Sequence, residues 1–162
     1  MPAPIGRDVT PATRALDAAG VVYSTHVFEH DPAVRDYGRE AADAIGADHD
    51  QVFKTLVVVV DGALAVAILP VSCQLSMKLA AAALGAKRAE MCDTTLAERT
   101  TGYVAGGISP FGQRKRLATV IDESAELYDT IYVSGGRRGL DLGVAPGDLV
   151  AMLAAAVAPI TA

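Results

Sequence analysis

The chain has 162 residues, of which 51% are hydrophobic and 20% charged, and its formal net charge is -5. This length and composition predict one compact globular domain over 1–162 and exclude a disordered chain. The acidic balance argues against a general nucleic-acid coat, so no DNA partner is expected. The apolar runs are too short for a membrane span of ~20 residues, and no signal peptide is recognisable, which predicts a cytoplasmic protein without a membrane partner.

The residues that most often bind metals are scattered. Cys73 and Cys92 lack the CxxC spacing of a zinc site, and His26, His30 and His49 are not at metal-ligand spacing. We therefore expect no metal site and two reduced, structural thiols.

Local signals mark the elements of the N-terminal third. Thr10 before Pro11 is typical of a helix start, and Gly20 of its end. A strand is expected over 21–28 and a short helix over 38–45.

The strongest strand prediction is 52–60, which the pair Asp61-Gly62 connects to a return strand over 63–69. Because both faces of 52–60 are apolar, this strand should be central and covered on both sides. The remaining elements are expected, in chain order, as a helix after Ser76 closed by Gly85, a strand over 86–91, a helix after Asp93 closed by Gly102, strands over 117–122, 130–134 and 140–144, and a last helix from Pro146 to 157. The irregular alternation and the two hairpins predict an α+β fold rather than a doubly wound sheet.

The segment 106–116, GGISPFGQRKR, nearly spells a phosphate-binding loop. Its glycines have the required spacing, but Gln113 and Arg114 stand where Lys and Ser/Thr would reach the phosphates and Mg²⁺. The phosphate-loop hypothesis therefore fails. The paired glycines could instead offer backbone amides to a carbonyl or phosphate oxygen, or form a plain turn.

Lys54 stands out because it shares a strand face with Leu56 and Val58. A lysine there must reach water, a partner or an anionic ligand. It either lines a pocket or carries its ammonium outward along its own stem, and the pattern leaves both open.

A second glycine loop, SGGRRG at 134–139, is either a simple hairpin loop or frames one cleft together with the first. Asp141 follows it and points opposite to Leu140 and Leu142, which indicates a solvent-facing carboxylate. Ser109 has no His–Asp pattern around it, which disfavours a serine hydrolase. The basic clusters are typical of a solvated surface, with binding as the alternative.

Four segments together resemble the YbaK/EbsC-like Cys-tRNA(Pro) deacylases, freestanding relatives of the editing domain in bacterial prolyl-tRNA synthetases: FEHDP (28–32), VFKTL (52–56), TGYVAGGISPFGQRKRL (101–117) and IYVSGGRRGLDL (131–142). The resemblance covers nearly the whole chain. It implies a mixed, barrel-like β core with flanking helices, and a hydrolase without a cofactor that removes cysteine from Cys-tRNA(Pro) and by extension from Cys-tRNA(Cys). The implied partners are the acceptor end of aminoacyl-tRNA and prolyl-tRNA synthetase.

The resemblance also implies roles for single residues. Lys54 would hold the terminal adenosine or phosphate and orient the ester, and Gly106 would face the ester carbonyl as an oxyanion hole. Substrate-binding roles fall on Phe28, His30, Gly107, Ile108, Ser109, Pro110, Ser134, Gly135, Gly136 and Asp141. Candidates for contact with the tRNA backbone are Arg114, Lys115, Arg116, Arg137 and Arg138. Phe28 departs from the family pattern, because many members carry Tyr there.

Editing is needed because cysteine and proline are close in size, and a synthetase pocket separates such near-isosteres poorly. The implied mechanism uses the substrate's own thiol, which attacks the ester carbonyl and leaves as a cyclic thiolactone. Neither Cys73 nor Cys92 would then be needed. Two alternatives are a deacylase that removes alanine from Ala-tRNA(Pro) with an activated water, and a non-catalytic module that binds a synthetase or a nucleotide.

Overall fold

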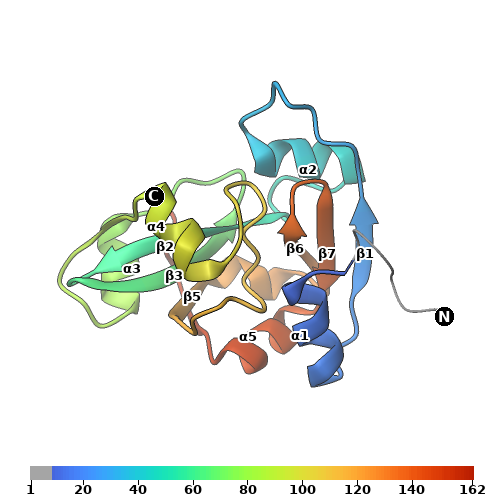
Figure 1. The fold of residues 1–162 in the computed structure, drawn as a ribbon. Coiled ribbons are helices and arrows are strands. Elements are labelled where there is room, and N and C mark those ends of the chain that lie inside the picture. Colours follow the sequence, from blue (N-terminus) through green and yellow to red (C-terminus); the bar gives the residue numbers. More distant parts are fainter. Residues whose placement is uncertain (1–8) are drawn as a thin grey trace.

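Two β-sheets with helices around them make up the fold, which a computed structural model describes for residues 9–162 (Figure 1). The helices are α1 (Pro11–Ala19), α2 (Tyr37–Ile45), α3 (Met77–Ala83), α4 (Thr94–Thr101), the 3-10 helix η2 (Glu123–Leu127) and α5 (Pro146–Leu153). The strands are β1 (Ser24–Val27), β2 (Phe53–Val60), β3 (Ala63–Pro70), β4 (Ala89–Met91), β5 (Ala118–Asp122), β6 (Ile131–Arg137), β7 (Leu140–Val144) and β8 (Ala156–Ala158). The predicted mixed α+β class is confirmed.

The larger sheet has five strands in the order β4-β2-β3-β5-β8, and the smaller has three in the order β1-β7-β6. In Figure 1 the smaller sheet stands to the right, with α2 above it and α1 below. The sheets are joined through a bridge between Val52 and Tyr132, whose amide donates to the Gln51 carbonyl at 3.1 Å. The described strands therefore form two linked sheets rather than one closed barrel.

The β2–β3 hairpin follows from its turn. Asp61 and Gly62 have φ values of 48° and 85°, the two left-handed conformations that a tight hairpin turn requires. The Asp61 carboxylate accepts from the amides of Lys87 and Arg88 at 2.9 and 3.0 Å, which fixes the turn against the start of β4.

The main core lies between the two sheets. It includes Phe53 and Val57 of β2, Val133 of β6, Leu142 of β7 and Leu16 of α1. Side chains on the opposite face of β2 belong to two further clusters. The prediction that this strand is covered on both sides is thus confirmed. Each fully buried aliphatic side chain contributes about 1.5–3 kcal/mol to burial free energy.

Several boundaries were wrong. The strand expected over 86–91 covers only Ala89–Met91, and the strand expected over 130–134 continues to Arg137 through the two glycines expected in a hairpin loop. The helix expected from Pro146 to 157 ends at Leu153, because Ala154 adopts a left-handed conformation with φ 50°. Residues 156–158 form β8 instead, a strand parallel to β5 at the edge of the larger sheet. The strand expected over 21–28 is confined to Ser24–Val27, the part that pairs with β7.

Across residues 9–162, no helix is both long and apolar enough to cross a bilayer. The same residues contain no group of three or more His, Cys, Asp or Glu side chains that could hold a metal ion. The expectation about a signal peptide rests partly on residues 1–8, which lie outside the described residues.

Candidate active site

A cavity of about 310 Å³ is lined by β2 of the larger sheet and by residues of β6 and β7 of the smaller one, and its volume lies within the size range of small-molecule sites. One wall is β2 from Val52 to Val57, and the start of α2 forms another. Residues of α4 and the loop 105–108 line a third side, and Ser134 of β6 and Asp141 of β7 also face the cavity. The site thus draws on segments from most of the chain.

Lys54 lies on the cavity wall with its amine already held by the protein. Its Nζ donates to the Cys73 carbonyl at 2.7 Å. Partial burial lowers the pKa of Lys54, and the negative charge of Asp36 opposes this shift. One N–H direction is used by the carbonyl, so the others can donate to an anionic or carbonyl ligand.

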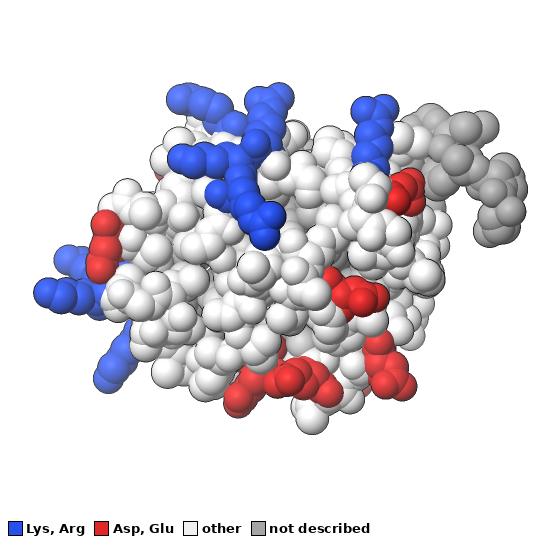
Figure 2. Space-filling view, turned by 90° about the horizontal axis from the view of Figure 1, so that it is seen from below, with Lys and Arg blue, Asp and Glu red and all other residues white. Residues whose placement is uncertain are grey.

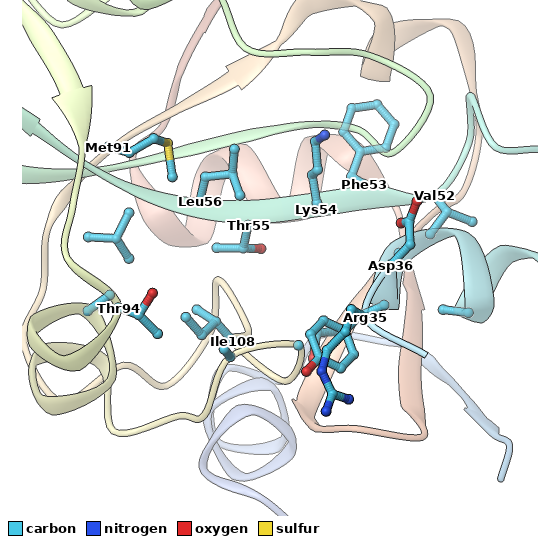
Figure 3. Close-up of a pocket in the computed structure, with 18 of the residues that line it drawn as sticks. Arg35, Asp36, Val52, Phe53, Lys54, Thr55, Leu56, Met91, Thr94 and Ile108 are labelled. Carbon is cyan, nitrogen blue, oxygen red and sulfur yellow. The ribbon is translucent and has the colours of Figure 1, made fainter. Parts of the chain in front are cut away.

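The two faces of β2 present different groups. In Figure 3, Lys54 and Leu56 project from one side of the strand, and Thr55 projects from the other side, toward Thr94 and Ile108. The Thr55 hydroxyl oxygen is buried and has no hydrogen-bond partner within the described part of the chain. Leaving a buried hydroxyl unpaired costs about 1–3 kcal/mol. The Thr55 hydroxyl at the cavity wall is therefore available to form a hydrogen bond with a ligand.

Gly106 presents a free backbone amide. Its φ is 82°, and no group of residues 9–162 accepts a hydrogen bond from its N–H. A Cβ at this position would lie 2.6 Å from the Tyr37 ring, so only glycine fits. The exposed amide can therefore donate to a ligand oxygen.

The two glycine loops meet beside the cavity. A Cβ on Gly107 would lie 2.8 Å from the Arg137 Cα, so the backbones are in close contact. The Arg138 Nε donates to the Ala105 carbonyl at 2.8 Å. The hypothesis that both loops frame one cleft agrees with this arrangement, in which Gly106 and Ser134 line the same cavity.

Asp141 is buried, and the expectation of a solvent-facing carboxylate was wrong. Its exposed fraction is 6%, because β7 lies between β1 and β6 with the core on one face and the cavity on the other. Loss of solvation raises the pKa of Asp141 to about 7. Opposite it on β6 lies Ser134, whose hydroxyl accepts from the Gly136 amide at 3.3 Å. A carboxyl group that titrates near neutral pH therefore faces the cavity.

Several predicted residues lie outside the cavity lining: Phe28, His30, Gly107, Ser109, Pro110, Gly135 and Gly136. His30 packs behind Tyr37, which lines the cavity, with a distance of 5.5 Å between the two ring centroids. Its Nδ1 lies 2.6 Å from the Glu40 carboxylate. Ser109 is fully buried, and its hydroxyl accepts from the Phe111 amide at 3.2 Å, which orders the loop.

Other lining residues were not expected, among them Arg35, Asp36, Tyr37, Thr55, Met91, Cys92 and Thr94. Asp36 could have been recognised in the sequence as the residue that begins α2, because Asp is a preferred helix cap. In the structure its side chain does cap α2, by accepting from the Arg39 amide at 3.4 Å. A helix begun at Asp36 would have placed Tyr37 in its first turn. Cys92 lies in the wall as a free thiol that donates to the Asp93 carbonyl at 3.3 Å.

The basic residues that follow the first glycine loop are exposed. Arg114 lies across the end of α4, where its amide donates to the Thr101 carbonyl at 3.0 Å and where Arg99 also lies. No acidic side chain of the described residues forms an ion pair with Arg99, Arg114, Lys115 or Arg116. Figure 2 shows a group of Lys and Arg side chains at the top of one face and others at its left, while Asp and Glu side chains lie mainly toward the bottom and right. Such a patch suits a polyanion.

An open cavity with a free amide, a held lysine and a buried carboxyl defines a site for a small polar ligand on a mixed α+β scaffold. The family model described as "Aminoacyl-tRNA editing domain" matches residues 31–152. A protein of Enterococcus faecalis (strain ATCC 700802 / V583), which carries the name Cys-tRNA(Pro)/Cys-tRNA(Cys) deacylase EbsC, is 37% identical over 157 residues, 94% of this chain and 93% of that protein. The chain therefore belongs to the aminoacyl-tRNA editing domain family.

One further relative and one solved structure are also similar to this chain. A proline–tRNA ligase of Shouchella clausii (strain KSM-K16) is 41% identical over 73 residues, which are 45% of this chain and 13% of the ligase. A crystal structure described as a trans-editing enzyme for prolyl-tRNA synthetase superposes with a TM-score of 0.83 at 23% identity and covers 98% of this chain and 99% of that one. The second likeness establishes the fold alone.

Proposed function

We propose that this chain is an aminoacyl-tRNA deacylase that clears cysteine from Cys-tRNA(Pro). Family membership and the name carried by the relative at 37% identity support the reaction class and the substrate. The observation that carries the proposal is one cavity lined by both Lys54, on a strand, and Gly106, on a loop with an unpaired amide. An ester needs such a pairing, with one group to orient it and one to stabilise its carbonyl oxygen.

In this proposal the ester carbonyl lies against the Gly106 amide, and the terminal nucleoside lies toward Lys54 and Tyr37. The aminoacyl side chain enters the apolar part of the cavity near Val57 and Ile108. Phosphates upstream of the terminal nucleotide continue over the exposed basic residues at 114–116. A cavity of about 310 Å³ admits only this end of the tRNA, so the remainder lies on the surface.

The chemistry needs no nucleophile from the protein. The substrate thiol loses its proton to solvent, and its sulfur attacks the ester carbonyl carbon to form a tetrahedral oxyanion that the Gly106 amide stabilises. The bond from carbon to the ribose oxygen then breaks, the ribose oxygen takes a proton, and a thiolactone leaves and is hydrolysed by water. Positioning of the two reacting groups supplies the acceleration.

The contents of the cavity fit this assignment. No histidine is among the described residues that line it, so neither Ser134 nor Cys92 has a base of the usual kind beside it. Burial raises the pKa of the Cys92 thiol, which disfavours the thiolate that a nucleophile would need.

A panel of aminoacyl-tRNAs tests the function. Purified protein is incubated with Cys-, Ala- and Pro-tRNA(Pro), with and without prolyl-tRNA synthetase, and the released product is identified by mass spectrometry. We expect rapid loss of cysteine through a thiolactone, with alanine and proline spared. Equal release of alanine would support the water-dependent alternative, and binding without turnover would support a non-catalytic module.

A further inference from the structure

Arg138 makes two contacts within the protein that a side chain reserved for the tRNA backbone would not need. Its Nε donates to the Ala105 carbonyl at 2.8 Å, and its guanidinium carbon lies 4.8 Å from the centroid of the Tyr37 ring. Both contacted groups are next to Gly106: Ala105 precedes it in the sequence, and the Tyr37 ring packs against it. From this geometry we infer that Arg138 is a positioning residue for the Gly106 amide. The inference rests on the proposed function, in which that amide faces the ester.

The two contacts fix the loop from two directions. The hydrogen bond to Ala105 holds the peptide group immediately before Gly106. The Tyr37 ring occupies the space where a Cβ of Gly106 would be, only 2.6 Å from its ideal position, so the ring limits how far the glycine can move. Tyr37 is supported in turn by His30, which Glu40 holds at 2.6 Å.

This arrangement requires the chemistry of arginine. The planar guanidinium can stack over an aromatic ring while its Nε–H donates in the plane of the group. A lysine at 138 would keep the positive charge but would lose both the planar stack and the Nε donor. Charge and positioning can therefore be separated by one conservative substitution.

The exposed basic residues at 114–116 provide the contrast. Arg116 is exposed. Among the described residues its guanidinium has neither a hydrogen bond to a backbone carbonyl nor a stacked aromatic ring, whereas Arg138 has both. If Arg138 only contacted the tRNA, its replacement would act like replacement of Arg116: it would weaken tRNA affinity and change the salt dependence of that affinity. A positioning role would instead lower the rate of the chemical step in the saturated complex.

The test compares Arg138→Lys and Arg138→Met with Arg116→Met, and with Arg88→Lys and Arg88→Met as controls outside the cavity lining. Single-turnover deacylation of Cys-tRNA(Pro) is measured over a range of protein and salt concentrations. We expect both Arg138 variants to lower the saturating rate about ten- to a hundredfold, the effect of a small misplacement at a reacting group, with the half-saturating protein concentration within about twofold of wild type. We expect Arg116→Met to raise the half-saturating concentration instead, and the Arg88 variants to match wild type.

A second readout is independent of turnover. In ¹⁵N-labelled protein without tRNA, the Gly106 amide resonance should shift in Arg138→Lys, while urea unfolding remains cooperative. The inference is overturned if Arg138→Lys keeps the wild-type saturating rate, or if the Gly106 resonance does not change. If wild type itself leaves Cys-tRNA(Pro) intact, the proposed function fails, and the resonance still decides whether Arg138 holds the loop.

Discussion

Single side chains in the cavity carry polar groups that the fold leaves without ordinary partners. Asp141 is a buried carboxyl whose pKa of about 7 arises from lost solvation alone, and Thr55 has a buried hydroxyl without a partner in the described residues. Both features reduce stability unless a ligand compensates for them. They are therefore more informative about function than the well-bonded polar residues nearby.

Asp141 predicts how stability depends on pH. Its folded-state pKa of about 7 lies above the ordinary value of 3.8, so the folded protein binds this proton more tightly than the unfolded chain. The contribution of Asp141 to the free energy of unfolding is therefore greatest below pH 4 and decreases as the pH rises to about 7. As the pH rises from about 4 to about 7, the free energy of unfolding of Asp141→Asn should increase relative to that of wild type, by up to about 4 kcal/mol. Urea unfolding at pH 4 and pH 8 measures the difference, with the exposed Asp129→Asn as the control. A constant offset at both pH values would contradict the assignment.

Thr55 predicts opposite effects on stability and activity. Thr55→Val keeps the shape of the side chain and removes the unpaired hydroxyl, so the free energy of unfolding should increase by about 1 kcal/mol. The same change should slow deacylation of Cys-tRNA(Pro), because the hydroxyl is no longer there for the substrate. Thr119→Val is the matched control: that buried hydroxyl donates to the Leu117 carbonyl at 3.0 Å, so its removal should be destabilising. A destabilised Thr55→Val with normal activity would show that Thr55 is structural.

Helix α1 and the second glycine loop are coupled through one residue. Thr10 caps α1 by accepting from the Thr13 amide at 3.2 Å, and its own amide donates to the Thr13 hydroxyl at 2.9 Å. The Thr10 hydroxyl also donates to the Gly135 carbonyl on β6. The cap of a helix outside the cavity thus supports the strand that carries Ser134.

Thr10→Ala should lower the free energy of unfolding by about 2 kcal/mol, at the upper end for removal of a cap, because it also leaves the Gly135 carbonyl unpaired. Ser76→Ala removes only the α3 cap, whose hydroxyl accepts from the Leu79 amide at 3.1 Å, and should cost about 1 kcal/mol or less. Urea unfolding of both variants makes the comparison. Equal losses would mean that the bond to Gly135 contributes nothing.

Elements with local signals could be predicted from the sequence. The cap at Thr10 and the turn at Asp61-Gly62 act within a few residues, so α1 and the β2–β3 hairpin were located correctly. The strand β8 could not be found, because alanines favour a helix and the strand exists through pairing with β5. Its boundary depends on the left-handed Ala154, a position without a glycine to mark it.

The candidate site was predictable only in part. The segments around Lys54, Gly106, Ser134 and Asp141 were identified, and these residues line one cavity. Strand alternation states which residues share a face but not what covers that face. The exposure of Asp141 was therefore misjudged, and Thr55 was missed.

Charge is distributed unevenly over the molecule. The net charge is -5, yet several basic side chains lie close together at the top of the face in Figure 2. Binding of a polyanion depends on such local patches, and overall repulsion from an acidic protein keeps the affinity low. A synthetase partner that brings the tRNA would offset this repulsion.

Replacement of Arg114, Lys115 and Arg116 by serine should weaken tRNA(Pro) binding, because these side chains would no longer neutralise phosphates. The slope of log affinity against log salt should become shallower by about one for each phosphate that the variant leaves without a cation. Lys87→Ser with Arg88→Ser removes charge elsewhere and should leave the slope unchanged. Filter binding at several salt concentrations gives both slopes. If the two variants behave alike, the basic run is only a solvated surface.

We propose that this cavity clears cysteine through the thiol of the substrate and not through a thiol of the protein. The most direct measurement is the single-turnover rate of a Cys73→Ala/Cys92→Ala variant on Cys-tRNA(Pro) and Ala-tRNA(Pro), with the fold verified by urea unfolding. We predict that the folded variant clears cysteine within about threefold of the wild-type rate, since both thiols lie outside the proposed reaction, and that it spares alanine. Loss of Cys-tRNA(Pro) deacylation in the folded variant, or equal clearance of alanine, would contradict the account.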